Sequence, residues 1–147
     1  MKKLIYLSLA LLIAIVYSCK KESAQDSLQG MIEKGLDRSL AQVKLMAADL
    51  MSQPDKLPRT IDKDGAFVTS NSSWWCSGFF PGELWMLYEY TGDEALKTYA
   101  DNYTRRVEKE QFNKGTHDLG FMLYCSYGHA YRITEQHSIS NTTDNVP

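Results

Sequence analysis

Apolar side chains recur every three or four residues along most of the chain, which is the spacing of amphipathic helices. The first such run begins at Leu28 and reaches Leu50, and Pro54 and Pro58 end it because proline cannot continue a helix. The apolar positions that share one face of this run are Leu28, Ile32, Leu36, Leu40, Val43, Ala47 and Leu50. We therefore predict one long helix with a single apolar face.

Three further helices are predicted over residues 80–90, 93–111 and 118–133. Pro81 suits the first turn of the first of them, and Gly92 suits its C-terminal cap. The apolar face of the next helix consists of Leu96, Tyr99, Ala100, Tyr103 and Val107. The inner positions of the last helix are Leu119, Met122, Leu123, Ser126, Tyr127, Ala130 and Ile133.

The segment between these helices, residues 57–73, is rich in turn-forming residues and shows no helical spacing. We predict an extended loop there, and no strand anywhere, because no segment alternates apolar and polar residues. Asp62 and Asp64 resemble the start of a calcium-binding loop, but Ser73 stands where that loop needs a glutamate. The pattern thus predicts an all-α chain without a calcium site.

A weak internal repeat suggests how the helices are arranged. Residues 87–93 align with residues 130–136 at a constant offset of 43 positions, and each segment would close one helix. A repeat of that size is typical of stacked helical hairpins, which form either a closed toroid or an open solenoid. The polar tail of residues 135–147 has no apolar face and departs from the repeat.

The N-terminus has the features of a bacterial secretory signal. Two lysines precede an apolar stretch over residues 4–16, and small residues lead to Cys19. The ending resembles a lipobox, so residues 1–18 are predicted to be removed and Cys19 to carry a lipid. Residues 19–27 would then be a polar tether, and the protein would be anchored in the cell envelope. A soluble secreted protein is the alternative.

Charge and size exclude several classes of function. Without residues 1–18 the chain has 14 basic and 18 acidic side chains, so no basic surface for nucleic acid is expected. The remaining length suits one domain or part of one. Cys76 and Cys125 could form a disulfide in an oxidising compartment, but Cys125 lies in an apolar helical pattern, which favours two buried free thiols.

Two segments carry the candidate chemistry. The first contains Trp74, Trp75, Phe79 and Phe80, whose rings could pack on the C–H faces of a sugar or belong to the core. In the second, Asp118 follows His117 at the predicted start of a helix. Asp118 could simply cap that helix through backbone N–H bonds, or it could act on a substrate. Together the two segments favour carbohydrate chemistry.

Other catalytic classes find no support in the sequence. No glycine-rich phosphate loop, nucleophile elbow or metal-binding spacing of cysteines occurs. His117, His129 and His137 are too scattered along the chain to indicate a metal site. No metal site is predicted.

Residues 75–93 and 116–131 carry both of these segments in the order and with the separation found in a known family. The chain resembles the unsaturated glucuronyl hydrolases of glycoside hydrolase family 88, over residues 28–134. The resemblance implies the first third of an (α/α)6 barrel. It also implies removal of a 4,5-unsaturated glucuronic acid from lyase-generated oligosaccharides through hydration of the C4=C5 bond, without a cofactor.

The resemblance also implies roles for individual residues. Asp118 matches the first of two essential aspartates, while Trp75, Phe79 and His117 match positions that line the subsite for the unsaturated uronate. The second aspartate of the family lies beyond Pro147, so this chain alone is expected to be an inactive truncated form. An interrupted reading frame would explain the unusual tail.

Three alternatives remain open at this stage. The first is a helical-hairpin lipoprotein that binds glycans or a partner protein without turnover. The second is a relative that acts on unsaturated rhamnogalacturonan fragments, and the third is a fragment that does not fold stably. The glycan, its linkage and the oligomeric state are not encoded in any motif of the chain.

Overall fold

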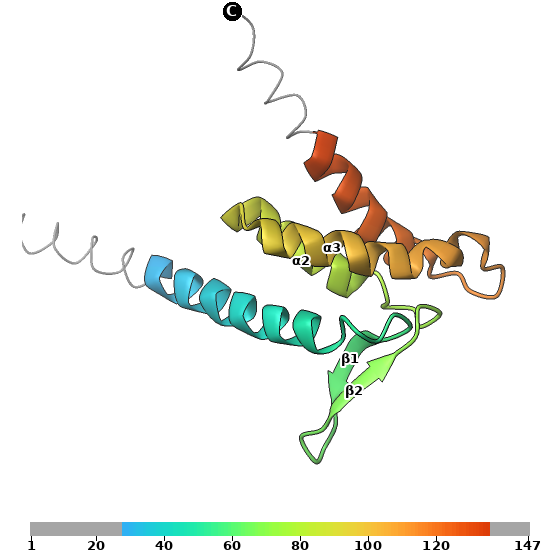
Figure 1. Ribbon diagram of the computed structural model, residues 1–147, viewed down its shortest axis with the longest axis horizontal. Coiled ribbons are helices and arrows are strands. Elements are labelled where there is room, and N and C mark those ends of the chain that lie inside the picture. Colours follow the sequence, from blue (N-terminus) through green and yellow to red (C-terminus); the bar gives the residue numbers. More distant parts are fainter. Residues whose placement is uncertain (1–27, 136–147) are drawn as a thin grey trace, which may run out of the picture. The chain divides into compact units, whose positions relative to one another are not determined.

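The computed structural model describes residues 28–135, which divide into two units at residues 41 and 42. A helix spans residues 28–49 (Figure 1). It includes residues of both units. In the second unit, Val43, Ala47 and Leu50 are buried, as their spacing predicts. Among the described residues, no helix combines the length and the apolar content needed to cross a membrane.

Several predictions from the sequence concern residues outside this range. The signal peptide of residues 1–18, the lipid-bearing Cys19, the tether of residues 19–27 and all but the first residue of the polar tail lie outside the described residues. They stay predictions.

A short β-hairpin follows the first helix, in the segment for which a loop without strands is predicted. Strands β1 (Leu57–Ile61) and β2 (Phe67–Ser70) pair antiparallel (Figure 1). The prediction of no strand is therefore wrong. Only Leu57 is fully buried in these strands, so they lack the alternation of apolar and polar residues that a half-buried sheet imposes.

The turn of this hairpin holds the two strands together instead. The Asp62 carboxylate accepts the backbone N–H groups of Asp64 at 2.9 Å and Ala66 at 2.8 Å. Gly65 has φ of 84°, which a side chain would disfavour. Such an aspartate–glycine turn is a sequence signal for a hairpin, and it is the signal that the strand prediction missed.

The two central helices confirm their prediction. Helix α2 (Phe79–Thr91) ends at Gly92, whose N–H donates to the carbonyl of Tyr88 at 2.7 Å with φ of 68°. Helix α3 (Glu94–Val107) is followed by a 3-10 turn, η1 (Glu108–Phe112), so the last turn of the predicted helix is tightened rather than α-helical.

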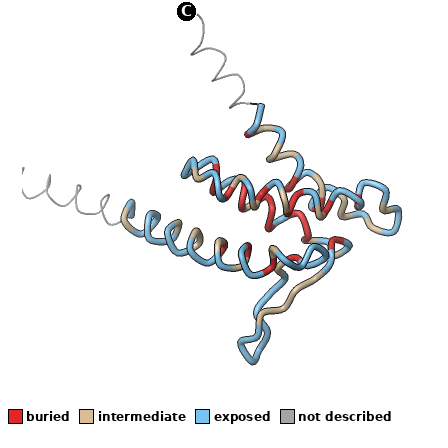
Figure 2. The backbone as a smooth tube through the Cα atoms, in the orientation of Figure 1, coloured by how far each residue is buried: buried red, intermediate tan, exposed pale blue. Residues whose placement is uncertain are grey.

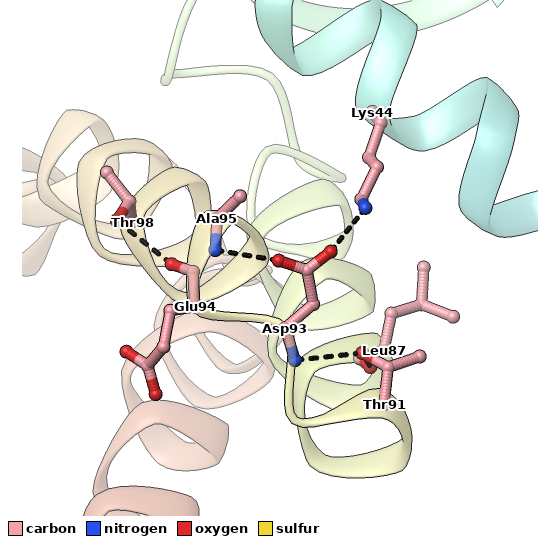
Figure 3. A network of polar contacts seen from close by, with 7 residues as sticks. All are labelled: Lys44, Leu87, Thr91, Asp93, Glu94, Ala95 and Thr98. Carbon is pink, nitrogen blue, oxygen red and sulfur yellow. Dashed lines mark hydrogen bonds and ion pairs between the residues drawn. The ribbon is translucent and has the colours of Figure 1, made fainter.

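Asp93 joins α2 to α3 and ties both to the first helix. One carboxylate oxygen accepts the N–H of Ala95 at 2.9 Å, which caps α3, and the other contacts the ammonium group of Lys44 (Figure 3). The N–H of Asp93 in turn donates to the hydroxyl of Thr91 at 3.3 Å. These contacts lower the pKa of Asp93, with the hydrogen bond from Lys44 as the largest cause.

We expect this site to make the fold acid-sensitive. A carboxyl group with a lowered pKa in the folded state adds stability above its unfolded pKa of about 4, and this stability is lost as the pH falls through the folded pKa. The variant Asp93→Asn keeps an oxygen for the cap but loses the ion pair. Urea unfolding should show a lower midpoint for the variant at pH 7, and the difference should shrink towards pH 2.5. A difference that does not change with pH would contradict this account.

The core of the second unit lies between α2, α3 and the last helix, where the buried residues gather (Figure 2). Phe80 meets the ring of Tyr103 edge to face at 4.9 Å between centroids. The Tyr103 hydroxyl donates to the carbonyl of Ala47 at 2.7 Å, and the Trp85 indole donates to Thr104 Oγ1 at 2.9 Å. The buried hydroxyl of Tyr103 and the buried indole N–H of Trp85 are therefore paired across elements.

Arg106 donates hydrogen bonds to carbonyl groups in the turn that follows the first helix. Its guanidinium donates to the carbonyls of Leu50, Gln53 and Lys56 at 3.1, 2.9 and 2.8 Å, and it stacks 4.0 Å from the ring centroid of Tyr103. A cation at a helix C-terminus is favoured by the helix dipole as well as by these bonds. The contact fixes where the chain turns from the helix into the hairpin.

The last helix is less regular than its apolar spacing predicts. Residues 120–128 form a π-helix, η2 (Gly120–Gly128), and residues 129–135 continue as an α-helix. Within η2, the Ser126 hydroxyl donates to the carbonyl of Met122 at 2.6 Å. π-helices are rare and often occur at functional sites.

Helix α2 and the last helix lie in parallel at the offset of the sequence repeat. Arg132 donates to both carboxylate oxygens of Glu89, at 2.6 and 2.7 Å, and these residues are 43 positions apart. Thr91 and Thr134, also 43 apart, each donate to the carbonyl four residues earlier at 2.7 Å. Matching positions of the two helices therefore lie side by side, as repeated hairpins require.

Candidate functional site

The site begins with a close approach between α2 and η2. A methyl group added at Gly82 would overlap the carbonyl oxygen of Cys125, and one added at Gly78 would overlap the carbonyls of Phe121 and Met122. Only glycine allows the two backbones to meet at these positions. The approach brings the start of α2 against the start of η2, which are the two segments singled out in the sequence.

Three aromatic rings meet at this junction. The ring centroids of Trp75, Phe79 and Phe121 are 5.6 to 6.0 Å apart, and every pair is edge to face. We call these three residues the aromatic cluster. Their exposed fractions are 44%, 40% and 48%, so each ring keeps a face open to solvent. For Trp75 and Phe79 the core interpretation is therefore wrong, whereas Phe80 is a core residue.

Asp118 lies beside this cluster at the N-terminal end of η2. Its backbone carbonyl accepts the N–H groups of Phe121 at 2.9 Å and Met122 at 3.2 Å, so the main chain, rather than the side chain, begins the helix. The carboxylate instead accepts the hydroxyl of Thr116 at 3.3 Å, while that hydroxyl accepts the N–H of Asp118 at 3.0 Å. The Asp118 carboxylate is thus not a helix cap, which leaves it free for another role.

His117 contributes the second contact to this carboxylate. Its Nε2 lies 3.5 Å from Oδ1 of Asp118, and its side chain is 97% exposed, against 22% for Asp118. The imidazole therefore projects into solvent beside a carboxylate that is largely covered. Such a pair can exchange hydrogen bonds with the hydroxyl groups of a ligand from the solvent side.

Two adjoining hollows open along α2 and η2 next to these groups. One, of about 320 Å³, is lined by residues that include His117, Asp118, Phe121 and Tyr124. The other, of about 440 Å³, includes Phe79, Glu83, Met86 and His129. Cys125 lines both, so the two hollows meet at this residue. Volumes of this size suit small ligands, and the mixed aromatic and polar lining suits a sugar.

Cys76 and Cys125 are both free thiols and both partly exposed. The prediction that they do not pair is confirmed, while the prediction that both are buried is wrong. Partial burial raises the pKa of the Cys125 thiol by desolvation, so the thiol stays protonated near neutral pH. Among residues 28–135, no group of three or more histidine, cysteine, aspartate or glutamate side chains is placed to hold a metal ion.

The structure adds residues to the site that the sequence did not single out as ligand contacts. Phe121 completes the aromatic cluster, and its spacing of three positions from Asp118 on one helix could have indicated a shared face. Glu83 lies four positions after Phe79 on α2, and both residues line the larger hollow. Burial raises the pKa of the Glu83 carboxyl. No sequence signal distinguishes this glutamate from an ordinary helix-surface residue.

Similarity to known proteins extends over most of the chain. No protein-family model matches the sequence. The chain is 35% identical over 133 residues to an unsaturated glucuronyl hydrolase of Formosa agariphila, and 34% identical over 97 residues to one of Bacillus sp. strain GL1. The chain is homologous to the unsaturated glucuronyl hydrolases. It covers only 32% and 25% of the length of these two relatives, while the matches cover 87% and 63% of the chain.

Solved structures of these hydrolases give the same result. A hydrolase described as specific for heparin superposes with a TM-score of 0.58 at 40% identity, covering 68% of this chain and 28% of that structure. The Bacillus sp. GL1 hydrolase superposes with a TM-score of 0.52 at 28% identity, covering 60% and 24%. The prediction of fold is confirmed: the mostly helical chain matches the first part of an (α/α)6 barrel.

Proposed function

We propose that residues 28–135 supply part of the substrate site of a hydrolase that removes 4,5-unsaturated glucuronic acid from oligosaccharides. One observation carries this proposal: a mostly covered carboxylate, Asp118, shares a hollow with Phe121, whose ring belongs to a half-exposed aromatic cluster. Homology to unsaturated glucuronyl hydrolases names the reaction class. The substrates of related enzymes include chondroitin disaccharides, according to their names.

The reaction needs a proton at one carbon of a double bond and water at the other. A carboxyl group protonates C4, water adds at C5, and the resulting hemiketal opens and releases the sugar. The aromatic cluster would hold the flat unsaturated ring, since C–H faces pack on aromatic rings. Asp118 would lie at the edge of that ring, with Thr116 and His117 orienting its carboxylate.

A chimera tests the proposed reaction. Residues 28–135 replace the aligned segment of the Formosa agariphila hydrolase, which supplies the rest of a barrel. Incubation with an unsaturated glucuronyl disaccharide should then remove the ultraviolet absorbance of the C4=C5 bond. The 147-residue chain alone is expected to leave the absorbance unchanged, because glycoside chemistry uses two carboxyl groups and the resemblance implies that the family's second aspartate lies outside these 147 residues. Decay with the chain alone would contradict the need for a second carboxylate.

The aromatic cluster is tested by binding. Trp75→Ala in the 147-residue chain should weaken binding of the unsaturated disaccharide by about tenfold, because one stacking surface of roughly 1–2 kcal/mol is lost. Phe112→Ala is the matched control, since Phe112 is 75% exposed and lies outside the cluster. Isothermal titration measures both. An equal effect of the two substitutions would show that the cluster is not the binding surface.

A further inference from the structure

Glu110, on η1, places a carboxylate in the interior of the second unit. The residue is 5% exposed, and it is the one buried residue with a charged side chain between residues 28 and 135. It takes part in none of the ion pairs of that range. A buried carboxylate without a cation is costly to desolvate, and an apolar side chain of similar size often stabilises a fold at least as well. Core packing alone therefore does not account for a glutamate at this position.

Both oxygens of the Glu110 carboxylate accept a hydrogen bond, and the two donors come from different loops. Oε1 accepts the hydroxyl of Ser72 at 2.5 Å, and Oε2 accepts the side-chain amide of Asn113 at 2.8 Å. Ser72 is itself only 3% exposed and lies 38 positions before Glu110. Hydrogen bonds to a carboxylate are about twice as strong as those between neutral groups. The carboxylate thus joins two segments that are distant in sequence.

The Ser72 end of this bridge leads to the aromatic cluster. Ser72 lies in the loop that enters α2, and consecutive turns shape this loop. The N–H of Trp74 donates to the carbonyl of Asn71 at 3.3 Å, and the N–H of Ser77 donates to the carbonyl of Trp74 at 2.9 Å. Trp75 lies within these turns, three positions after Ser72. The position of Ser72 therefore helps to fix where the Trp75 indole lies.

The Asn113 end of the bridge leads to Asp118. Oδ1 of Asn113 accepts the N–H of Gly115 at 2.9 Å, while its Nδ2 donates to Glu110. The hydroxyl of Thr116 then accepts the N–H of Asp118 at 3.0 Å and donates to its carboxylate at 3.3 Å. Hydrogen bonds and a short turn therefore connect the buried carboxylate of Glu110 to the carboxylate of the site.

We propose that Glu110 is a positioning residue, whose carboxylate ties the loop that carries Trp75 to the turn that carries Asp118. This inference rests on the proposed function, which gives the two ends of the bridge their roles as sugar platform and acid. Glu110 lines neither hollow of the site, so it acts through these two ends. It sets their separation, and a misplacement of about 1 Å between reacting groups can cost about a hundredfold in rate.

The bridge is tested first without substrate, by nuclear magnetic resonance of the 147-residue chain. Ser72→Ala should shift the amide resonances of Gly115 and Asp118, because Ser72 is joined to their turn through Glu110. In a Glu110→Ala background, Ser72→Ala should cause no further shift of these two resonances, since the bridge is already cut. Ser73→Ala is the matched control, because it removes a hydroxyl from the same loop that bonds to Asn71 instead. Equal shifts in Ser73→Ala, or shifts that persist in the Glu110→Ala background, would overturn the inference.

The consequence for the reaction is tested in the chimera. Glu110→Ala should lower kcat by about 10- to 100-fold and change KM by less than about threefold, since the sugar still binds the cluster while the acid is misplaced. Glu110→Gln keeps an oxygen for Asn113 and an amide that can donate to the Ser72 hydroxyl, so it should restore kcat to within about threefold. Glu108→Ala, on the exposed part of η1, should have no effect. All rates are compared below the unfolding midpoint of every variant, so that loss of folded protein does not contribute.

The two measurements separate the failure of this inference from the failure of the proposed function. Coupled resonances together with an unmodified chimera that does not consume the unsaturated disaccharide would support the bridge and overturn the proposed function. An active chimera in which Glu110→Ala keeps its kcat, or in which Glu110→Gln loses as much kcat as Glu110→Ala, would overturn the inference alone. Should Glu110→Ala fail to fold, Ser72→Ala and Asn113→Ala each cut one end of the bridge. An unchanged kcat in both would overturn the inference as well.

Discussion

Replacing Asp118 with asparagine is expected to slow turnover of the unsaturated disaccharide by the chimera about 10³-fold, the typical contribution of a positioned acid or base. Asparagine keeps the size of the side chain and an oxygen that can accept the Thr116 hydroxyl. It cannot carry a proton to the substrate. The loss should therefore appear in kcat, while KM should change by only a few fold.

The control for this variant is Asp101→Asn, which also removes one carboxylate. Asp101 lies on the exposed side of α3 and pairs with Arg105, away from both hollows of the site. Its substitution should leave kcat unchanged. If Asp118→Asn kept a kcat within tenfold of the unmodified chimera, the residue would have no part in the chemistry, and a glycan-binding protein without turnover would be the better interpretation.

Substituting alanine for Gly82 is expected to lower the free energy of unfolding by about 3 kcal/mol, at the upper end of typical overpacking costs. The added methyl group would overlap the carbonyl oxygen of Cys125 on η2, and a backbone atom cannot move aside as the end of a flexible side chain can. The helices would have to separate. That movement would also pull Phe79 away from Phe121, so the aromatic cluster would open.

Gly35 provides a control with the opposite sign. It lies within the helix of residues 28–49, and a methyl group added there would meet nothing within 4 Å. Gly35→Ala should therefore raise the free energy of unfolding by roughly 0.5–1 kcal/mol, because alanine is the better helix former. Urea unfolding of the 147-residue chain measures both variants. Equal stability of Gly82→Ala and the unmodified chain would show that α2 and η2 do not approach as closely as described.

The helices could be predicted from the sequence because their apolar faces are fixed by packing. Gly92 and Asp93 could also be placed, since a left-handed cap needs glycine and a helix start favours aspartate. The hairpin was missed because its strands are neither alternating nor buried on one face, and its turn carries the information instead. The apolar spacing of residues 118–133 fits an α-helix, so it gives no signal of the π-helical form of η2.

The candidate site was only partly predictable, for a related reason. A motif names residues that are close in sequence, such as His117 and Asp118, but not those that meet across elements. Phe121 joins Trp75 and Phe79 only because Gly78 and Gly82 let two helices meet. Such contacts depend on tertiary structure and leave no periodic pattern in the chain.

The most direct test of the account follows the aromatic cluster by nuclear magnetic resonance while the 147-residue chain is titrated with an unsaturated glucuronyl disaccharide. The account predicts that the side-chain resonances of Trp75, Phe79 and Phe121 shift together with one dissociation constant, while those of Phe112 and Tyr90, which are exposed aromatics outside the cluster, stay unchanged. Resonances of the cluster that do not respond at saturating disaccharide would contradict the claim that Asp118 and these rings line one sugar site.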